Sequence, residues 1–213
     1  MVDLFSYEQK FETIPMPDAD VAILRNMDMF DDPLRVFERL RIETVWQQQE
    51  MRIYGKSVLQ PRLTAWYGDR ERTYVYSGIR NVPLPWTNLL LLLRQAVEQL
   101  CEYRFNSVLL NYYRSGNDSM GFHSDNEREL GPMPVIASLS LGEPRVFLFK
   151  HSKITDLPIV RVPLDSGTLL LMKGPTQQYW KHAINKERPS VGGRINLTFR
   201  KIYTSAERDI LNS

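Results

Sequence analysis

Two histidines and one aspartate have the types and the spacing of a metal site. His123 and Asp125 are two residues apart, His182 follows much later, and the chain has only three histidines. In a strand or at its end, residues two apart point to the same side, so His123 and Asp125 can act together. Two imidazoles and one carboxylate can occupy one face of an iron ion and leave the opposite face open, as in non-haem Fe(II) oxygenases.

Other interpretations of this pattern remain open. Short histidine motifs also occur by chance, and three ligands equally suit a catalytic zinc ion. A zinc hydrolase would need a general base near the metal-bound water, and Glu127 is the only nearby candidate. The third histidine, His151, lies in a run of basic and polar residues, which predicts an exposed side chain that is not a ligand. Cys101, the only cysteine, follows Leu100 and is predicted to be a buried structural thiol.

A second pattern, over residues 194–200, alternates polar and apolar side chains without a break. Its apolar face belongs in a core, and its polar face consists of Arg194, Asn196, Thr198 and Arg200. Guanidinium groups inside or beside a sheet need partners, and a small dicarboxylate such as 2-oxoglutarate would satisfy both through charge-assisted hydrogen bonds. The alternative is a solvated outer face of an antiparallel sheet. Asn111 and Tyr113, on another predicted strand, would bond the same carboxylates or have ordinary packing roles.

The elements that must position these residues are predicted to be mainly helices in the first half of the chain and mainly strands after residue 106. Asp32-Pro33 predicts a helix start with an apolar stripe that continues to about Trp46, and a second helix is predicted from Thr87. The two stripes consist of Leu34, Phe37, Leu40 and Ile42, and of Leu90, Leu93, Val97 and Leu100. Strands are predicted at 107–113, 134–141, 145–150, 159–162, 167–172 and 193–203. Two helices followed by many short strands predict an α+β protein whose sandwich or barrel of strands carries the site.

Length and composition predict one intracellular domain. The chain has 213 residues, 43% of them hydrophobic, and no apolar run long enough to span a membrane. Its N-terminus has no basic region followed by an apolar one, so we expect the cytoplasm in a bacterium or the nucleus in a eukaryote. Charge is uneven, because residues 1–32 have a net charge of −6 and the rest of the chain +8. The basic part of the chain after residue 32 would suit a polyanionic partner, although the same charge is equally compatible with a solvated surface that binds nothing.

The order of these motifs resembles the AlkB family of Fe(II)/2-oxoglutarate dioxygenases. The pattern is Asn111-x-Tyr113-x-x-Gly116-x-Asp118-x-x-Gly121-x-His123-x-Asp125, then His182, then Arg194-x-Asn196-x-Thr198-x-Arg200. The similarity extends from about Tyr54 to Tyr203 and looks closest to the branch that repairs double-stranded DNA. It implies a double-stranded β-helix (jelly-roll) core at about 105–203, N-terminal helices, a nucleotide-recognition lid at about 45–85 and an acidic arm at 1–32. Together these make one dioxygenase domain, 1–213.

The resemblance also implies roles for individual residues. His123, Asp125 and His182 would bind Fe(II). The implied 2-oxoglutarate contacts are Asn111, Tyr113, Arg194, Asn196, Thr198 and Arg200. The resemblance implies three kinds of substrate contact. Tyr54 would be a finger that enters the duplex. Tyr74 and Tyr76 would hold the flipped base, and Asn126 and Glu127 would lie near its polar edge. The candidate phosphate contacts are Arg52, Lys56, Arg62, Arg70 and Arg72.

The implied reaction is oxidative removal of N-alkyl groups from bases of the 1-methyladenine and 3-methylcytosine type in DNA. This direct repair reaction uses Fe(II) as cofactor and 2-oxoglutarate and O2 as co-substrates, and it releases aldehyde, succinate and carbon dioxide. There are two alternatives. The same chemistry could demethylate RNA or hydroxylate a protein, or the chain could be a non-enzymatic jelly-roll module with a structural metal. The expected partner is alkylated DNA or RNA, without a membrane, and the expected state is a monomer. Tyr at 54, Ser124 and Asn126 depart from the family pattern and leave duplex preference and base choice open.

Overall fold

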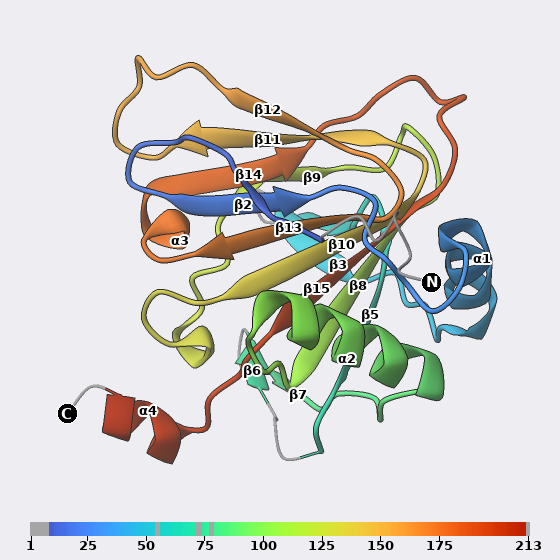
Figure 1. Cartoon of the computed structure of the whole chain (residues 1–213), viewed down its shortest axis with the longest axis horizontal. Helices are drawn as coiled ribbons and strands as arrows, with labels where there is room; N and C mark the ends of the chain where they lie inside the picture. The colour runs from blue at the N-terminus through green and yellow to red at the C-terminus, as the bar shows by residue number, and fades with distance from the viewer. Residues whose placement is uncertain (1–8, 54–55, 71–73, 77–78, 212–213) are drawn as a thin grey trace, which may run out of the picture.

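Two antiparallel β-sheets form the body of the protein. The computed structural model describes residues 9–53, 56–70, 74–76 and 79–211, and Figure 1 shows one sheet above the other. The larger sheet consists, in spatial order, of β1 (Glu12–Thr13), β2 (Asp20–Leu24), β13 (Thr168–Lys173), β10 (Ile136–Gly142), β15 (Arg194–Arg200), β8 (Ser107–Tyr113) and β5 (Leu63–Gly68). The smaller sheet consists of β12 (Val160–Leu164), β11 (Arg145–His151), β14 (Trp180–Ile184) and β9 (Met120–His123). This arrangement confirms the predicted jelly roll and most of the predicted strands.

Two helices cover the outer face of the larger sheet. They are α1 (Pro33–Glu43) and α2 (Asn88–Cys101), and α2 lies beneath the strands in Figure 1. Their buried residues share one apolar cluster with Ile195, Leu197 and Phe199, the apolar face of β15. The polar face of β15 therefore points the other way, toward the space between the two sheets. The remaining short helices are η1 (Arg128–Leu130), α3 (Thr176–Tyr179) and α4 (Ser205–Leu211).

The first long helix begins at its predicted cap, and the second begins one residue after its predicted start at Thr87, which is its cap. The Asp32 carboxylate accepts hydrogen bonds from the backbone N–H groups of Leu34 and Arg35, and the Thr87 hydroxyl accepts one from Leu90. The predicted stripe of α1 was wrong in part, because Leu34 and Ile42 are exposed and the helix ends at Glu43. Its buried face is Val36, Phe37 and Leu40. Val36 and Phe37 lie about one helical turn before Leu40, and the helix contacts β10 and β15.

The segment predicted as an acidic arm contributes two strands to the larger sheet. β2 pairs antiparallel with β13 and buries Val21 and Ile23, whereas Asp18 and Asp20 stay exposed. Pairing with a strand some 150 residues away is not visible in the local sequence, which explains why this segment was predicted to be an arm.

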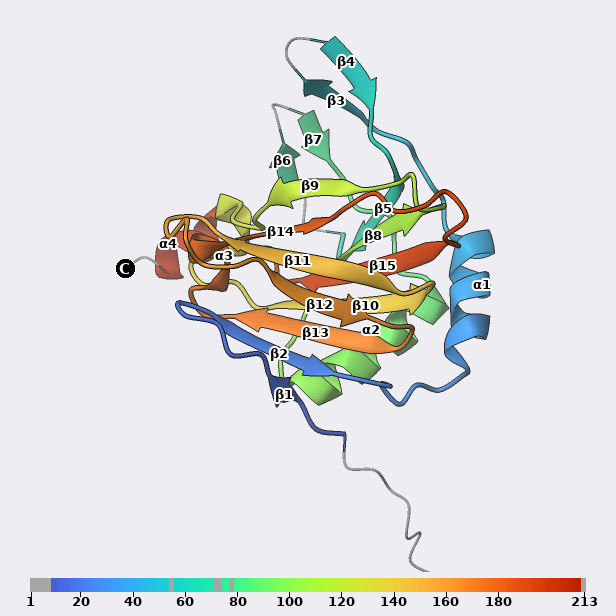
Figure 2. The same cartoon turned by 90° about the horizontal axis from the view of Figure 1, so that it is seen from above.

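The predicted lid region contains two β-hairpins. One is formed by β3 (Glu50–Ile53) and β4 (Lys56–Leu59), and the other by β6 (Tyr74–Tyr76) and β7 (Ile79–Asn81). Figure 2 shows both hairpins projecting from the same side of the body. Within the part of the chain that the structure describes, no helix is long and apolar enough to cross a bilayer.

Candidate metal and dicarboxylate site

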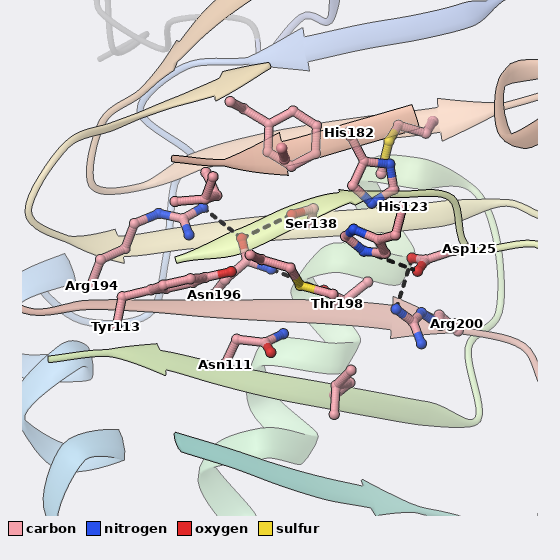
Figure 3. Close-up of a pocket in the computed structure, with 16 residues that line it drawn as sticks. Asn111, Tyr113, His123, Asp125, Ser138, His182, Arg194, Asn196, Thr198 and Arg200 are labelled. Carbon is pink, nitrogen blue, oxygen red and sulfur yellow. Dashed lines mark hydrogen bonds and ion pairs between the residues drawn. The ribbon is translucent and has the colours of Figure 1, made fainter. Parts of the chain in front are cut away.

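The three predicted metal ligands meet between the two sheets. His123 ends β9, Asp125 follows two residues later, and His182 on β14 is the cross-strand partner of His123. One potential ligand atom from each residue lies within 4.8 Å of the other two. Figure 3 shows all three side chains at the same end of one pocket. The structure thus brings together residues that are 59 positions apart in the sequence.

Both imidazoles are in a form that can bind a metal. His123 Nδ1 lies 2.9 Å from the carbonyl oxygen of Gly121, which can only accept, so in the neutral ring Nδ1 carries the proton and Nε2 has the lone pair that can face a metal. Burial lowers the pKa of His182 to about 3, so this ring is neutral near pH 7. Its Nδ1 atom is buried without a hydrogen-bond partner among the described residues. The His182 ring also stacks on Phe147, with centroids 5.1 Å apart, which fixes its plane.

The carboxylate of Asp125 is buried but charged. Burial acts to raise its pKa, but the charge of the Arg200 guanidinium and its hydrogen bond act in the opposite direction, and the pKa stays below its ordinary value. Arg200 Nη2 donates to Asp125 Oδ2 at 2.7 Å, and Asp125 Oδ1 lies 3.8 Å from His123 Nε2. Two imidazoles and one carboxylate are a donor set that fits Fe(II).

Arg194 lies at the opposite end of the same pocket from this triad (Figure 3). Its side chain is fully buried, and burial lowers its pKa to about 10. Nη2 donates to Ser140 Oγ at 2.8 Å and to Asn196 Oδ1 at 2.7 Å. Nε and Nη1 are buried and have no hydrogen-bond partner among the described residues. Because unsatisfied buried donors are costly, these two atoms fit an anionic ligand such as a carboxylate.

Four of the other predicted dicarboxylate contacts line the same pocket as Arg194 and have different roles, whereas Arg200 lies at the triad end (Figure 3) and bonds Asp125. Asn196 is already engaged at both ends, since Oδ1 accepts from Arg194 and Ser138 and Nδ2 donates to Thr198 Oγ1. Asn196 and Thr198 therefore orient the guanidinium group of Arg194. Asn111 Oδ1 accepts from Arg62 Nε at 2.8 Å, which leaves its amide nitrogen for a ligand. The Tyr113 ring packs against Arg194 and also lines the pocket.

The predicted base contacts are outside this pocket or outside the described residues. Tyr54 lies outside the described residues. Tyr74 and Tyr76 lie on β6, for which the structure describes the backbone but not the side chains. Asn126 is exposed and Glu127 half-buried, directly after Asp125, and neither lines the pocket. Glu127 Oε2 is buried without a hydrogen-bond partner among the described residues.

Two predictions from local sequence were wrong. Arg62, a predicted phosphate contact, is buried beside Asn111, and burial lowers its pKa. His151, predicted to be exposed, is buried: its Nδ1 accepts from the N–H groups of Lys153 and Ile154, and its ring packs against Trp180. Arg70 is exposed as a phosphate contact requires, whereas the side chains of Arg52, Lys56 and Arg72 lie outside the described part.

Three buried polar residues of the site were missed. Ser138 and Ser140 lie on β10 opposite the polar face of β15, and they bond Asn196 and Arg194. Their alternation with leucines was a usable signal of a strand with one polar face. Gln177 accepts a hydrogen bond from the backbone N–H of Asp125 at 2.9 Å, and nothing in its sequence context indicates this contact.

Comparisons with known proteins agree with this geometry. A model of the 2OG-Fe(II) oxygenase superfamily matches residues 31–200. The chain is 44% identical over 176 residues to alkB homolog 3, an alpha-ketoglutarate-dependent dioxygenase of Bos taurus, covering 79% of this chain and 61% of that protein. It is 40% identical over 158 residues to the DNA oxidative demethylase ALKBH2 of Homo sapiens, covering 71% of this chain and 60% of that protein. The chain thus spans about three fifths of these relatives.

A solved structure is also similar. The structure of OsALKBH1 superposes with a TM-score of 0.62, at 18% identity, covering 90% of this chain and 100% of that chain. At this identity the likeness shows the fold alone.

Proposed function

Because this chain belongs to the 2OG-Fe(II) oxygenase superfamily, we propose that it removes N-alkyl groups from DNA bases by Fe(II)- and 2-oxoglutarate-dependent oxidation. The names of its relatives confirm the AlkB resemblance that the motifs predicted. The observation that supports the proposal most strongly is one pocket with a His–Asp–His triad at one end and a buried, partly unsatisfied arginine at the other. A protein that used the metal only for structure would not need a buried, partly unsatisfied arginine at the other end of the pocket.

The chain's own residues hold the reactants. His123, Asp125 and His182 would bind Fe(II), and Arg194 would bind one carboxylate of 2-oxoglutarate through Nε and Nη1. When bound, Fe(II) and 2-oxoglutarate supply with O2 the oxidation that hydroxylates the N-alkyl carbon and yields succinate, carbon dioxide and, after hemiaminal collapse, an aldehyde. Arg200 keeps Asp125 ionised, and so keeps it a ligand, by its 2.7 Å hydrogen bond. The apolar lining residues Leu109, Met120, Phe147 and Met172 restrict water in the pocket.

The substrate base must leave its stack to reach this pocket. Flipping costs a few kcal/mol, and less when alkylation already prevents pairing. We propose that Tyr74, Tyr76, Asn126 and Glu127 contact the flipped base and that Tyr54 fills the gap in the duplex. The bases would be of the 1-methyladenine or 3-methylcytosine type, and the protein would act as a monomer inside the cell, in the cytoplasm of a bacterium or the nucleus of a eukaryote. The names of the relatives support DNA as the substrate, and RNA or a protein side chain is the competing choice.

A direct comparison of substrates tests this function. We expect methylated DNA to give the fastest succinate release when DNA, RNA of the same sequence and a methylated peptide are each offered with Fe(II), 2-oxoglutarate and air. The preference over RNA should be at least about tenfold, because a pocket discriminates between substrates that differ by one small group by roughly 10- to 200-fold. Faster release with RNA or with the peptide would refute DNA repair but leave the dioxygenase chemistry intact.

The finger role of Tyr54 gives a separate prediction. A base–aromatic stack is worth about 1–3 kcal/mol, so Tyr54→Ala should slow repair of duplex DNA by about 5- to 150-fold. Repair of single-stranded DNA needs no gap to be filled and should stay nearly unchanged. The measurement is kcat/KM on both substrates, and Tyr54→Phe serves as the control that keeps the aromatic ring. Equal losses on the two substrates would remove the finger role.

A further inference from the structure

Asp125 lies beyond the end of its strand, where ladder hydrogen bonds no longer position the chain. β9 ends at His123, which pairs with His182 on β14. The backbone N–H of Asp125 instead donates to the side-chain oxygen Oε1 of Gln177, at 2.9 Å, in a buried position. The aspartate is thus held at two places: its carboxylate by Arg200 and its backbone by Gln177.

The orientation of the Gln177 amide is determined by its two contacts. The side chain is almost completely buried, and Nε2 donates to Met172 Sδ at 3.4 Å. If the amide were turned around, Nε2 would face the N–H of Asp125, so that two donors would meet and one would stay unsatisfied. The geometry therefore presents an acceptor, in one orientation, to the backbone of a metal ligand.

Gln177 also belongs to the segment that carries the second histidine. It lies on α3, which leads directly into β14 and His182. α3 is itself tied to β2 and β13, because the Thr176 hydroxyl accepts from the N–H of Asp20 at 2.9 Å and bonds the carbonyl oxygen of Lys173 at 2.6 Å. One continuous segment, α3 with β14, therefore bears one metal ligand and accepts a hydrogen bond from the backbone of another.

We infer that Gln177 is a positioning residue that sets the place of the Asp125 carboxylate relative to His182 and so tunes metal affinity. This inference rests on the metal site of the proposed function. Groups that orient metal ligands from outside the coordination sphere typically change metal affinity by about 10- to 100-fold when removed. Gln177→Leu removes the acceptor and keeps an apolar side chain in the buried space, so we expect a loss of this size in metal affinity.

Cobalt(II) titration of the full chain tests the inference without turnover. The dissociation constant and the d–d absorption spectrum are measured for the wild-type protein, for Gln177→Leu and for Thr176→Val. Thr176→Val is the matched control, because it removes the hydrogen bonds of the same turn without touching Asp125. We expect Gln177→Leu to weaken Co(II) binding by about 10- to 100-fold and to alter the spectrum, whereas Thr176→Val lowers Tm but leaves affinity within about twofold.

The outcomes separate three cases. Unchanged affinity and spectrum in Gln177→Leu would overturn the role of Gln177 while leaving the metal site intact. An equal loss in Thr176→Val would also overturn it, because the effect would then come from the stability of the turn. Failure of the wild-type protein to take up Co(II) would overturn the proposed metal site and this inference with it. If Gln177→Leu does not fold, Gln177→Met, with a straight side chain and only a weak sulfur acceptor, takes its place with the same expected result.

Discussion

The His123→Ala variant is expected to lose at least about a thousandfold in product formation, equivalent to about 4 kcal/mol of barrier. With His123 removed, only Asp125 and His182 remain of the three potential ligands that lie within 4.8 Å of one another. Two ligands do not define one face of an iron ion, so both metal binding and the open coordination positions are lost. The measurement is release of succinate and aldehyde with methylated DNA, together with Tm.

The chain offers a matched control for this experiment. His151→Gln also removes a histidine, but one that contacts Trp180 and the backbone of the 151–154 turn. We expect this variant to lower Tm and to keep its turnover. The His123 side chain is partly exposed and bonds the backbone carbonyl oxygen of Gly121, so His123→Ala should stay folded. Near-normal turnover in a folded His123→Ala protein would refute the metal assignment.

The Arg194→Met variant is expected to weaken 2-oxoglutarate binding by at least about two orders of magnitude. Hydrogen bonds to charged groups contribute about 1.5–3 kcal/mol each, and Arg194 has two buried donors, Nε and Nη1, without a partner among the described residues. Methionine fills much of the same volume without charge. The measurement is the KM for 2-oxoglutarate in the succinate assay, and its dissociation constant from the metal-to-ligand charge-transfer band under anaerobic conditions.

A ligand that lacks the distal carboxylate completes a double-mutant cycle. 2-Oxopentanoate has the same five carbons as 2-oxoglutarate but a methyl group in place of the C5 carboxylate. In the wild-type protein it should bind about 100-fold more weakly than 2-oxoglutarate, whereas in Arg194→Met the two should differ little. If the two ligands still differ as strongly in the variant, Arg194 is not the partner of that carboxylate.

The sequence was most informative where the spacing of polar and apolar residues alone decides which side chains share a face of a strand. The alternation at 194–200 predicted one polar and one apolar face, and β15 has both, because a strand between two others must place alternate side chains on opposite sides. The strand at 107–113 was predicted with the bounds that β8 has. His123, Asp125 and His182 could be grouped because few chemical arrangements use those residue types at that spacing.

The errors came from residues whose environment is made by distant parts of the chain. His151 lies in a polar run, yet Tyr179 and Trp180 stack around it and the segment near Asp18 lies beside it. Arg62 has a basic side chain in a region predicted to meet phosphates, yet it is buried against Asn111, 49 residues away. Gln177 is similar: no local pattern shows that a glutamine in a short turn bonds Asp125, 52 residues earlier.

The two halves of the site belong to different sheets, and their neighbours differ. Arg194 is on β15, which has β10 on one side and β8 on the other, whereas His123 ends β9, an edge strand that pairs only with β14 in the part of the sheet that is described. Edge strands open more readily than central ones in native-state fluctuations. In the proposed function, metal release would therefore precede loosening of Arg194, so that partial opening would give an inactive protein whose arginine end is still formed when iron returns.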